Sequence, residues 1–123
     1  MGPTFSTSIQ LNRNRIHYRI EKKWIEFPIS QIQLIGEYAA PPGVLAADYF
    51  FSFKLRDIEE TVDVPAYTEG LFDEVLPGLK KLLPGVRGPR LQMETEFASN
   101  VLYPAHVAGM KMFAFQSEIK PLI

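Results

Sequence analysis

Residues 13–23, RNRIHYRIEKK, alternate cationic and apolar side chains. A β-strand sends successive side chains to opposite faces of its sheet, so this alternation predicts a strand with one buried and one solvated face. The apolar face consists of Ile16, Tyr18 and Ile20. The side chains of the opposite face are basic, and two lysines follow them in the sequence. We call these residues the basic stripe: Arg13, Arg15, His17, Arg19, Lys22 and Lys23.

Strand-like alternation continues on both sides of this stretch. It predicts further strands over 7–12, 22–30, 31–38, 48–56 and 60–67, joined by turns at 12–14 and 21–23 and by a Pro- and Gly-containing loop over 39–47. Pro28 predicts an edge position or a bulge, because proline cannot donate a hydrogen bond to a neighbouring strand. The first half of the chain is therefore predicted to be mainly antiparallel, meandering β-sheet.

The period changes after residue 70. Apolar residues then recur at spacings of three and four, as expected of an amphipathic helix: Leu71, Phe72, Val75, Leu76, Leu79, Leu82 and Leu83. Asp73 and Glu74 occupy its first turn and two lysines its last, which suits the helix dipole. Thr68 is the predicted N-cap. Pro77 predicts a kink or two short abutting turns, and Pro84 ends the helix.

The residues that follow the helix predict additional strands. Residues 89–99 alternate in polarity and are predicted as a strand, and 100–109 as a loop or short helical turn. Residues 110–116, MKMFAFQ, carry large apolar groups on both faces, so we expect a strand that is covered on both sides.

Size and composition restrict the class of protein. We expect a single domain over 1–123, with 1–7 a disordered start or cloning remnant, although Gly2 and Ser6 also match the myristoylation pattern. The net charge of −1 argues against a nucleic-acid partner. The absence of cysteine excludes disulfides and thiol chemistry. Neither a signal peptide nor a run of about 18 apolar residues is present, so we expect a cytoplasmic protein with no transmembrane segment.

The meandering strands followed by one amphipathic helix resemble a small bacterial pleckstrin-homology-like domain. The resemblance covers residues 8–84 and rests on WIEFPISQIQLIGEY (24–38), similar to the family's strand–IPxSxI–strand segment, and on DYFFSFKLRD, ETVDVPAY and GLFDEVLPGLKKLL. It implies an α+β fold in which a half-open sandwich or barrel is capped by the helix. Family members bind phosphoinositides, peptides or each other. Residues 85–123 form a C-terminal extension, since the family's helix ordinarily closes the domain.

Catalytic and metal-binding signatures are missing from the sequence. It contains no nucleophile elbow, zinc-protease motif or phosphate-binding glycine loop, and its two histidines, His17 and His106, are far apart. We therefore predict no catalytic residues, metal or cofactor, and keep an enzyme of unknown class as a distant alternative. Trp24 and the aromatic run 49–51 are interpreted as core packing.

Charge is distributed in two blocks. Residues 13–23 carry five Arg or Lys and one acid, whereas 57–74 carry seven acids and no Arg or Lys. Both blocks are interpreted as solvated faces. Two alternatives remain: the resemblance implies a phosphoinositide- or other anion-binding patch at the basic stripe, and opposite patches favour self-association. We expect a non-catalytic interaction or assembly module with a protein partner, and weak anionic-lipid binding as the alternative.

Overall fold

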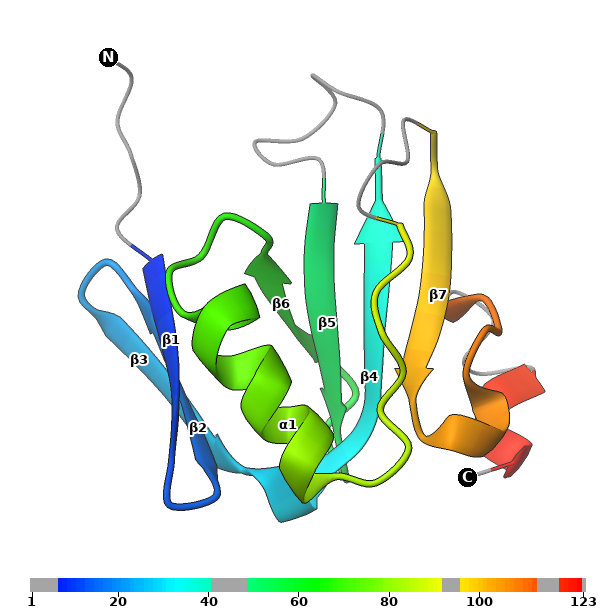
Figure 1. The fold of residues 1–123 in the computed structure, drawn as a ribbon, viewed down its shortest axis with the longest axis horizontal. Helices are drawn as coiled ribbons and strands as arrows, with labels where there is room; N and C mark the ends of the chain where they lie inside the picture. Colours follow the sequence, from blue (N-terminus) through cyan, green and yellow to red (C-terminus); the bar gives the residue numbers. More distant parts are fainter. Residues whose placement is uncertain (1–6, 41–48, 92–95, 113–117, 123) are drawn as a thin grey trace.

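A computed structural model describes residues 7–40, 49–91, 96–112 and 118–122. The fold is α+β, with two antiparallel sheets. The first sheet has the order β1-β2-β3, with bounds Thr7–Asn12, Arg15–Ile20 and Lys23–Pro28. The second has the order β6-β5-β4-β7, with bounds Thr61–Pro65, Tyr49–Leu55, Ile32–Ala39 and Ala98–Tyr103. Figure 1 shows helix α1 in front of the sheets, with β1 on one side of it and residues 83–91 on the other.

The predicted alternation in the first three strands is confirmed. Ile16 faces Phe27 and Tyr18 faces Ile25 across the β2–β3 pair, and Ile9 faces Tyr18 across β1–β2. These side chains form one face, which packs toward the second sheet through the contact between the Phe27 and Phe53 rings (centroids 5.7 Å apart). Because a strand has only two faces, the side chains that alternate with these are directed outward. Pro28 ends an edge strand, as predicted.

The predicted helix is confirmed, and Pro77 is accommodated by a change of helix type. Leu71–Val75 form a π turn, in which the Val75 amide donates to the Gly70 carbonyl (2.8 Å), and Leu76–Leu82 continue as α1. Pro77 thus falls in the first turn of α1, where a missing N–H is tolerated. The buried side of the helix is Leu71, Val75, Leu76 and Leu79, whereas Phe72 and Leu82 remain partly exposed.

The predicted N-cap is wrong. Gly70, with φ of 92°, precedes the helix, and no side chain caps it. Thr68 lies buried instead, where its hydroxyl accepts a hydrogen bond from that of Thr7 (3.2 Å) and its carbonyl accepts one from the Leu71 amide (3.2 Å). The side chain that a simple N-cap would have used therefore joins the loop before the helix to β1.

The chain after the helix completes the second sheet, but not where the sequence predicted. Of the strand expected over 89–99, residues 92–95 lie outside the described residues, and 89–91 and 96–97 do not form a strand. β7 begins at Ala98, and most of it lies in the predicted loop 100–109. The reason is that the polar side chain of Asn100 is buried, so the sequence of β7 lacks the regular alternation of polar and apolar residues that marks a strand. Met110–Met112 do not form the predicted strand; both methionines pack against a second apolar cluster, formed by Leu34, Val101, Val107 and Ile119. Residues 113–116 of that predicted strand lie outside the described residues.

The raised pKa values of three tyrosines predict that the protein loses stability at high pH. Burial raises the pKa of Tyr18 to about 12, and burial together with the nearby Asp63 carboxylate raises that of Tyr38 to about 12. Burial and the hydrogen bond to Glu37 also raise the pKa of Tyr49. Unfolded tyrosine loses its proton near pH 10, before these folded side chains do, so the stability they provide is present below pH 10 and lost as the pH rises through about 12.

We expect the contribution of these tyrosines to the free energy of unfolding, measured by urea titration between pH 8 and 12, to be constant up to about pH 10 and to fall above it. Between pH 10 and about 12 the slope is about 1.4 kcal/mol per pH unit for each of these tyrosines, because the unfolded side chain has lost its proton while the folded one keeps it. Tyr18→Phe should reduce that slope. An unchanged slope in this variant would show that Tyr18 ionises equally in both states.

Candidate functional site

The outer face of the first sheet is the surface that the cross-strand register assembles from side chains pointing away from the core. Its central row places His17 between Gln10 and Glu26, and the next row places Arg19 between Ser8 and Trp24. We call this surface the outer face; it comprises Ser8, Gln10, Asn12, Arg15, His17, Arg19, Trp24, Glu26 and Pro28.

Trp24 is the most unusual residue of the outer face. Its exposed fraction is 59%, so its interpretation as core packing is wrong. The physical reason is register: Ile25 and Phe27 pair with Tyr18 and Ile16 on the buried side, which leaves Trp24 on the solvated side. The alternation of Ile25 and Phe27 was the sequence signal that could have placed it there. Single exposed apolar side chains are common on protein surfaces, so the interest of Trp24 comes from its position on a regular strand opposite Arg19.

The basic stripe is divided by the fold. Arg15, His17 and Arg19 share the outer face as predicted. Arg13 lies in the β1–β2 turn with φ of 53°, and Lys22 lies in the β2–β3 turn. Lys23 pairs with Ile20 and therefore lies on the opposite side of the sheet, at its exposed end. The stripe is thus three side chains on one face, with Arg13 and Lys22 at the turns that bound β2.

Part of the positive charge is neutralised within the outer face. His17 Nδ1 lies 2.9 Å from Glu26 Oε1, and Arg15 lies 4.0 Å from the other carboxylate oxygen. The Arg19 side chain donates to the Ser8 hydroxyl (3.4 Å). Glu26 lies three residues beyond the stretch 13–23, so the count of charges in that stretch does not include it. Exposed pairs of this kind contribute about 0–1 kcal/mol and leave the cations able to exchange partners.

Two shallow hollows include residues of the outer face, one at its central row and one at its end. One, of about 470 Å³, is lined by Gln10, Asn12, His17, Trp24 and Glu26. The other, of about 590 Å³, lies at the β1–β2 turn, where its polar lining includes Arg13, Arg15 and Ser30. The first offers an aromatic surface with hydrogen-bonding groups, and the second offers two guanidinium groups and a hydroxyl.

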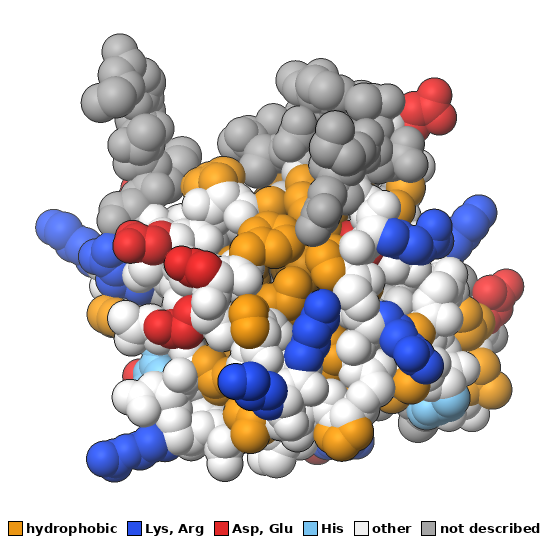
Figure 2. Space-filling model, in the orientation of Figure 1, with side chains coloured by type: hydrophobic (Ala, Val, Ile, Leu, Met, Phe, Trp, Pro, Cys, Tyr) orange, Lys and Arg blue, Asp and Glu red, His pale blue; other side chains and the backbone are white. Residues whose placement is uncertain are grey.

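The acidic block is also divided. Asp57, Glu59 and Glu60 are exposed in the β5–β6 connection. Asp63, on β6, accepts hydrogen bonds from the Ser52 and Thr61 hydroxyls, and Glu74 accepts one from the Leu11 amide (3.2 Å). Figure 2 shows acidic side chains gathered over the start of the helix and basic ones over its far end and the adjoining segment.

A buried carboxylate was missed by the sequence analysis. Glu37 is fully buried on the inner side of β4 and accepts four hydrogen bonds: from the Tyr49 hydroxyl (2.6 Å), Asn100 Nδ2 (2.8 Å) and the amides of Arg90 (2.9 Å) and Leu91 (3.1 Å). Both oxygens are therefore engaged, and the group joins three strands to the segment after the helix. We assign it to structure. No local signal could have shown this, since its partners lie far along the chain.

Within the described ranges, no group of three or more His, Asp or Glu side chains could hold a metal ion. His106 Nε2 lies 2.8 Å from the Leu122 carbonyl oxygen. No helix in the part of the chain that the structure describes is long and apolar enough to cross a membrane. Comparison with family models, curated proteins and solved structures gave no match for this chain.

Proposed function

We propose that this protein is a non-catalytic interaction module that binds a protein partner through the outer face of its first sheet. The observation that carries the proposal is the exposed indole of Trp24 directly opposite Arg19, with Arg15 two rows further along the same face. Tryptophan and arginine are the side chains most enriched among the residues that dominate binding energy at protein interfaces. These side chains stand on β-strands, whose backbone is already ordered, so less conformational entropy is lost when a partner binds.

The chemistry of the face indicates the kind of partner. Arg15 and Arg19 lie on either side of His17 along β2, and Lys22 lies in the following turn. A segment that pairs a large apolar side chain with carboxylates would contact both the indole and the cations. Glu26, already paired with His17, would disfavour a highly charged polyanion at the centre.

A second candidate is binding of an anionic lipid headgroup, which the hollow with Arg13 and Arg15 favours. Each basic side chain near an anionic membrane contributes about 1 kcal/mol, so this small group supports weak and salt-sensitive adsorption. The Glu26 carboxylate near Arg15 reduces it further.

We also propose that the β1–α1 part is pleckstrin-homology-like. Two antiparallel sheets and one amphipathic helix support this assignment. β7 is a departure from it, because it follows the helix and pairs with β4.

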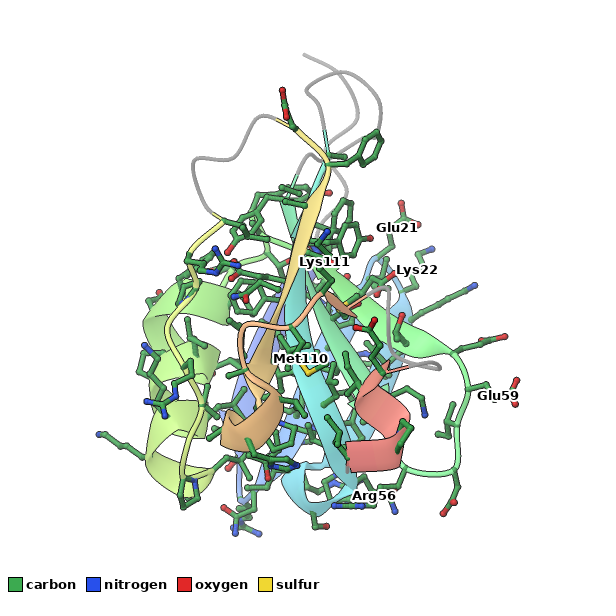
Figure 3. The ribbon with its side chains drawn as sticks, turned by 90° about the vertical axis from the view of Figure 1, so that its right-hand side faces the viewer. Glu21, Lys22, Arg56, Glu59, Met110 and Lys111 are labelled. Carbon is green, nitrogen blue, oxygen red and sulfur yellow. The ribbon has the colours of Figure 1, made fainter. Side chains whose placement is uncertain are left out.

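Site-specific photocrosslinking tests the proposal. A photoreactive amino acid is placed at Gln10, which lines the Trp24 hollow, and in a matched control at Lys111, an exposed residue near β7 (Figure 3). In an extract of the source organism, Gln10 should give a discrete protein adduct that Lys111 does not give and that Trp24→Ala abolishes. No adduct, or the same adduct from both positions, would contradict the proposal. Binding to phosphatidylserine vesicles that Arg13→Glu plus Arg15→Glu abolishes, without such an adduct, would establish the second candidate instead.

A further inference from the structure

The turn between β5 and β6 presents an apolar side chain among acids. We call residues 57–60, DIEE, the acidic turn. All four are exposed, and the exposed fraction of Ile58 is 48%. About half of the Ile58 surface therefore stays in water, which limits its contribution to stability.

Hydrogen bonds from a buried lysine fix the backbone of the acidic turn. The Lys54 side chain is buried, and its ammonium group donates to the Leu55 carbonyl (2.7 Å) and to the Ile58 carbonyl. Asp57 adopts φ of 62°, which reverses the chain. A turn whose backbone is fixed by a buried cation is preorganised, and a preorganised segment loses less entropy when it binds.

The acidic turn and the outer face are complementary. The turn offers Ile58 flanked by three carboxylates, and the outer face offers Trp24 opposite Arg19, with Lys22 in the next turn and Arg15 two rows away. Apolar contact at the centre with opposite charges around it is the usual anatomy of a specific interface. We infer that the partner of the outer face is the acidic turn of a second copy of this chain. This inference rests on the proposed function and names its partner.

Every copy carries both an acidic turn and an outer face, so two chains can make the same contact twice. Figure 3 shows Lys22, in the turn that follows β2, and Glu59, in the acidic turn, on the same side of the molecule, opposite the helix. A two-fold rotation then lets each copy place its acidic turn on the other copy's outer face, which gives two equal contacts. One turn alone covers a small area, whereas stable interfaces bury about 800 Å² on each partner, so both contacts are required.

Charge exchange between the two surfaces tests this inference. One variant carries Arg15→Glu and Arg19→Glu, and the other carries Glu59→Lys and Glu60→Lys. Sedimentation equilibrium of the wild-type chain should show a monomer–dimer equilibrium that weakens with salt. Each variant alone should dissociate with a Kd raised at least about tenfold, because both of its contacts become repulsive. An equimolar mixture of the two variants should recover a heterodimer, since both contacts are then attractive.

A third variant avoids charge altogether. Ile58→Ala removes only an exposed side chain, so it should fold normally and weaken the dimer about tenfold. Thermal melting of all variants controls for folding. A wild-type chain that stays monomeric at every concentration, or a mixture that fails to associate, would overturn the inference. If Gln10 then still crosslinks to a protein of another mass, the proposed function stands; if it gives no adduct, both fail.

Discussion

Glu37→Ala should lower the free energy of unfolding by about 3–5 kcal/mol, the cost typical of breaking a buried charge network. The substitution leaves the Tyr49 hydroxyl, the Asn100 amide and the backbone amides of Arg90 and Leu91 without their acceptor. Each buried donor without a partner costs about 1–3 kcal/mol, and a domain of this size has about 5–15 kcal/mol in total. Urea denaturation monitored by circular dichroism measures the change.

Two variants divide that effect into parts. Tyr49→Phe removes one donor and leaves the carboxylate three others, so it should cost about 1–2 kcal/mol. Glu37→Gln keeps the shape but turns one acceptor atom into a donor, so its cost should lie between those of Tyr49→Phe and Glu37→Ala. A Glu37→Ala protein as stable as wild type would show that the network contributes nothing to folding.

The second large effect is expected at Gly70. Its φ of 92° is a conformation that side chains rarely adopt, and a Cβ atom there would overlap the carbonyl oxygen of Ile9. That carbonyl belongs to β1 and cannot move without disturbing the contact between β1 and residue 69, where the Ile9 amide donates to the Glu69 carbonyl (2.8 Å). Gly70→Ala should therefore cost about 3 kcal/mol or more, combining backbone strain with a backbone clash.

Gly109 provides a matched control. Its φ is 94°, nearly the same as that of Gly70, but a Cβ atom there would meet nothing within 4 Å. Gly109→Ala should cost only the backbone strain, about 1–2 kcal/mol. Thermal melting of Gly70→Ala and Gly109→Ala gives the loss of stability in each variant. The difference between the two losses is the cost of the overlap between the new Cβ atom at position 70 and the Ile9 carbonyl of β1. Equal losses at both positions would show that the contact is relieved by a shift of the helix start.

Prediction from sequence succeeded where each element is determined by its own residues. β2 and β3 alternate regularly because both carry an apolar inner face, and the helix is marked by seven apolar residues at helical spacing. It failed where distant residues decide. Asn100, on β7, is buried because Glu37, more than sixty positions earlier in the chain, accepts a hydrogen bond from its side-chain amide. No property of residues 98–103 alone indicates that partner.

The candidate site shows the same division. The outward direction of Arg15, His17 and Arg19 followed from the alternation of β2, as predicted. The exposure of Trp24 followed from the same rule but was obscured by the general expectation that tryptophan is buried. Lys23 was grouped with the stripe by proximity in sequence, whereas pairing with Ile20 places it on the other side of the sheet. The neutralising contact with Glu26 required the register of two strands.

The pairing of β4 with β7 has a consequence for the order of events during synthesis. β4 leaves the ribosome long before residues 98–103, and until those arrive one of its edges is open. During that interval Glu37 lacks its bonds to Arg90, Leu91 and Asn100, so the carboxylate is better accommodated in water than in a core. The first sheet is local in sequence and can form early, but the second sheet can close only after β7 has been made. The growing chain therefore carries an unpaired strand edge for much of its synthesis, a state in which a chaperone or a neighbouring nascent chain has its best opportunity to bind.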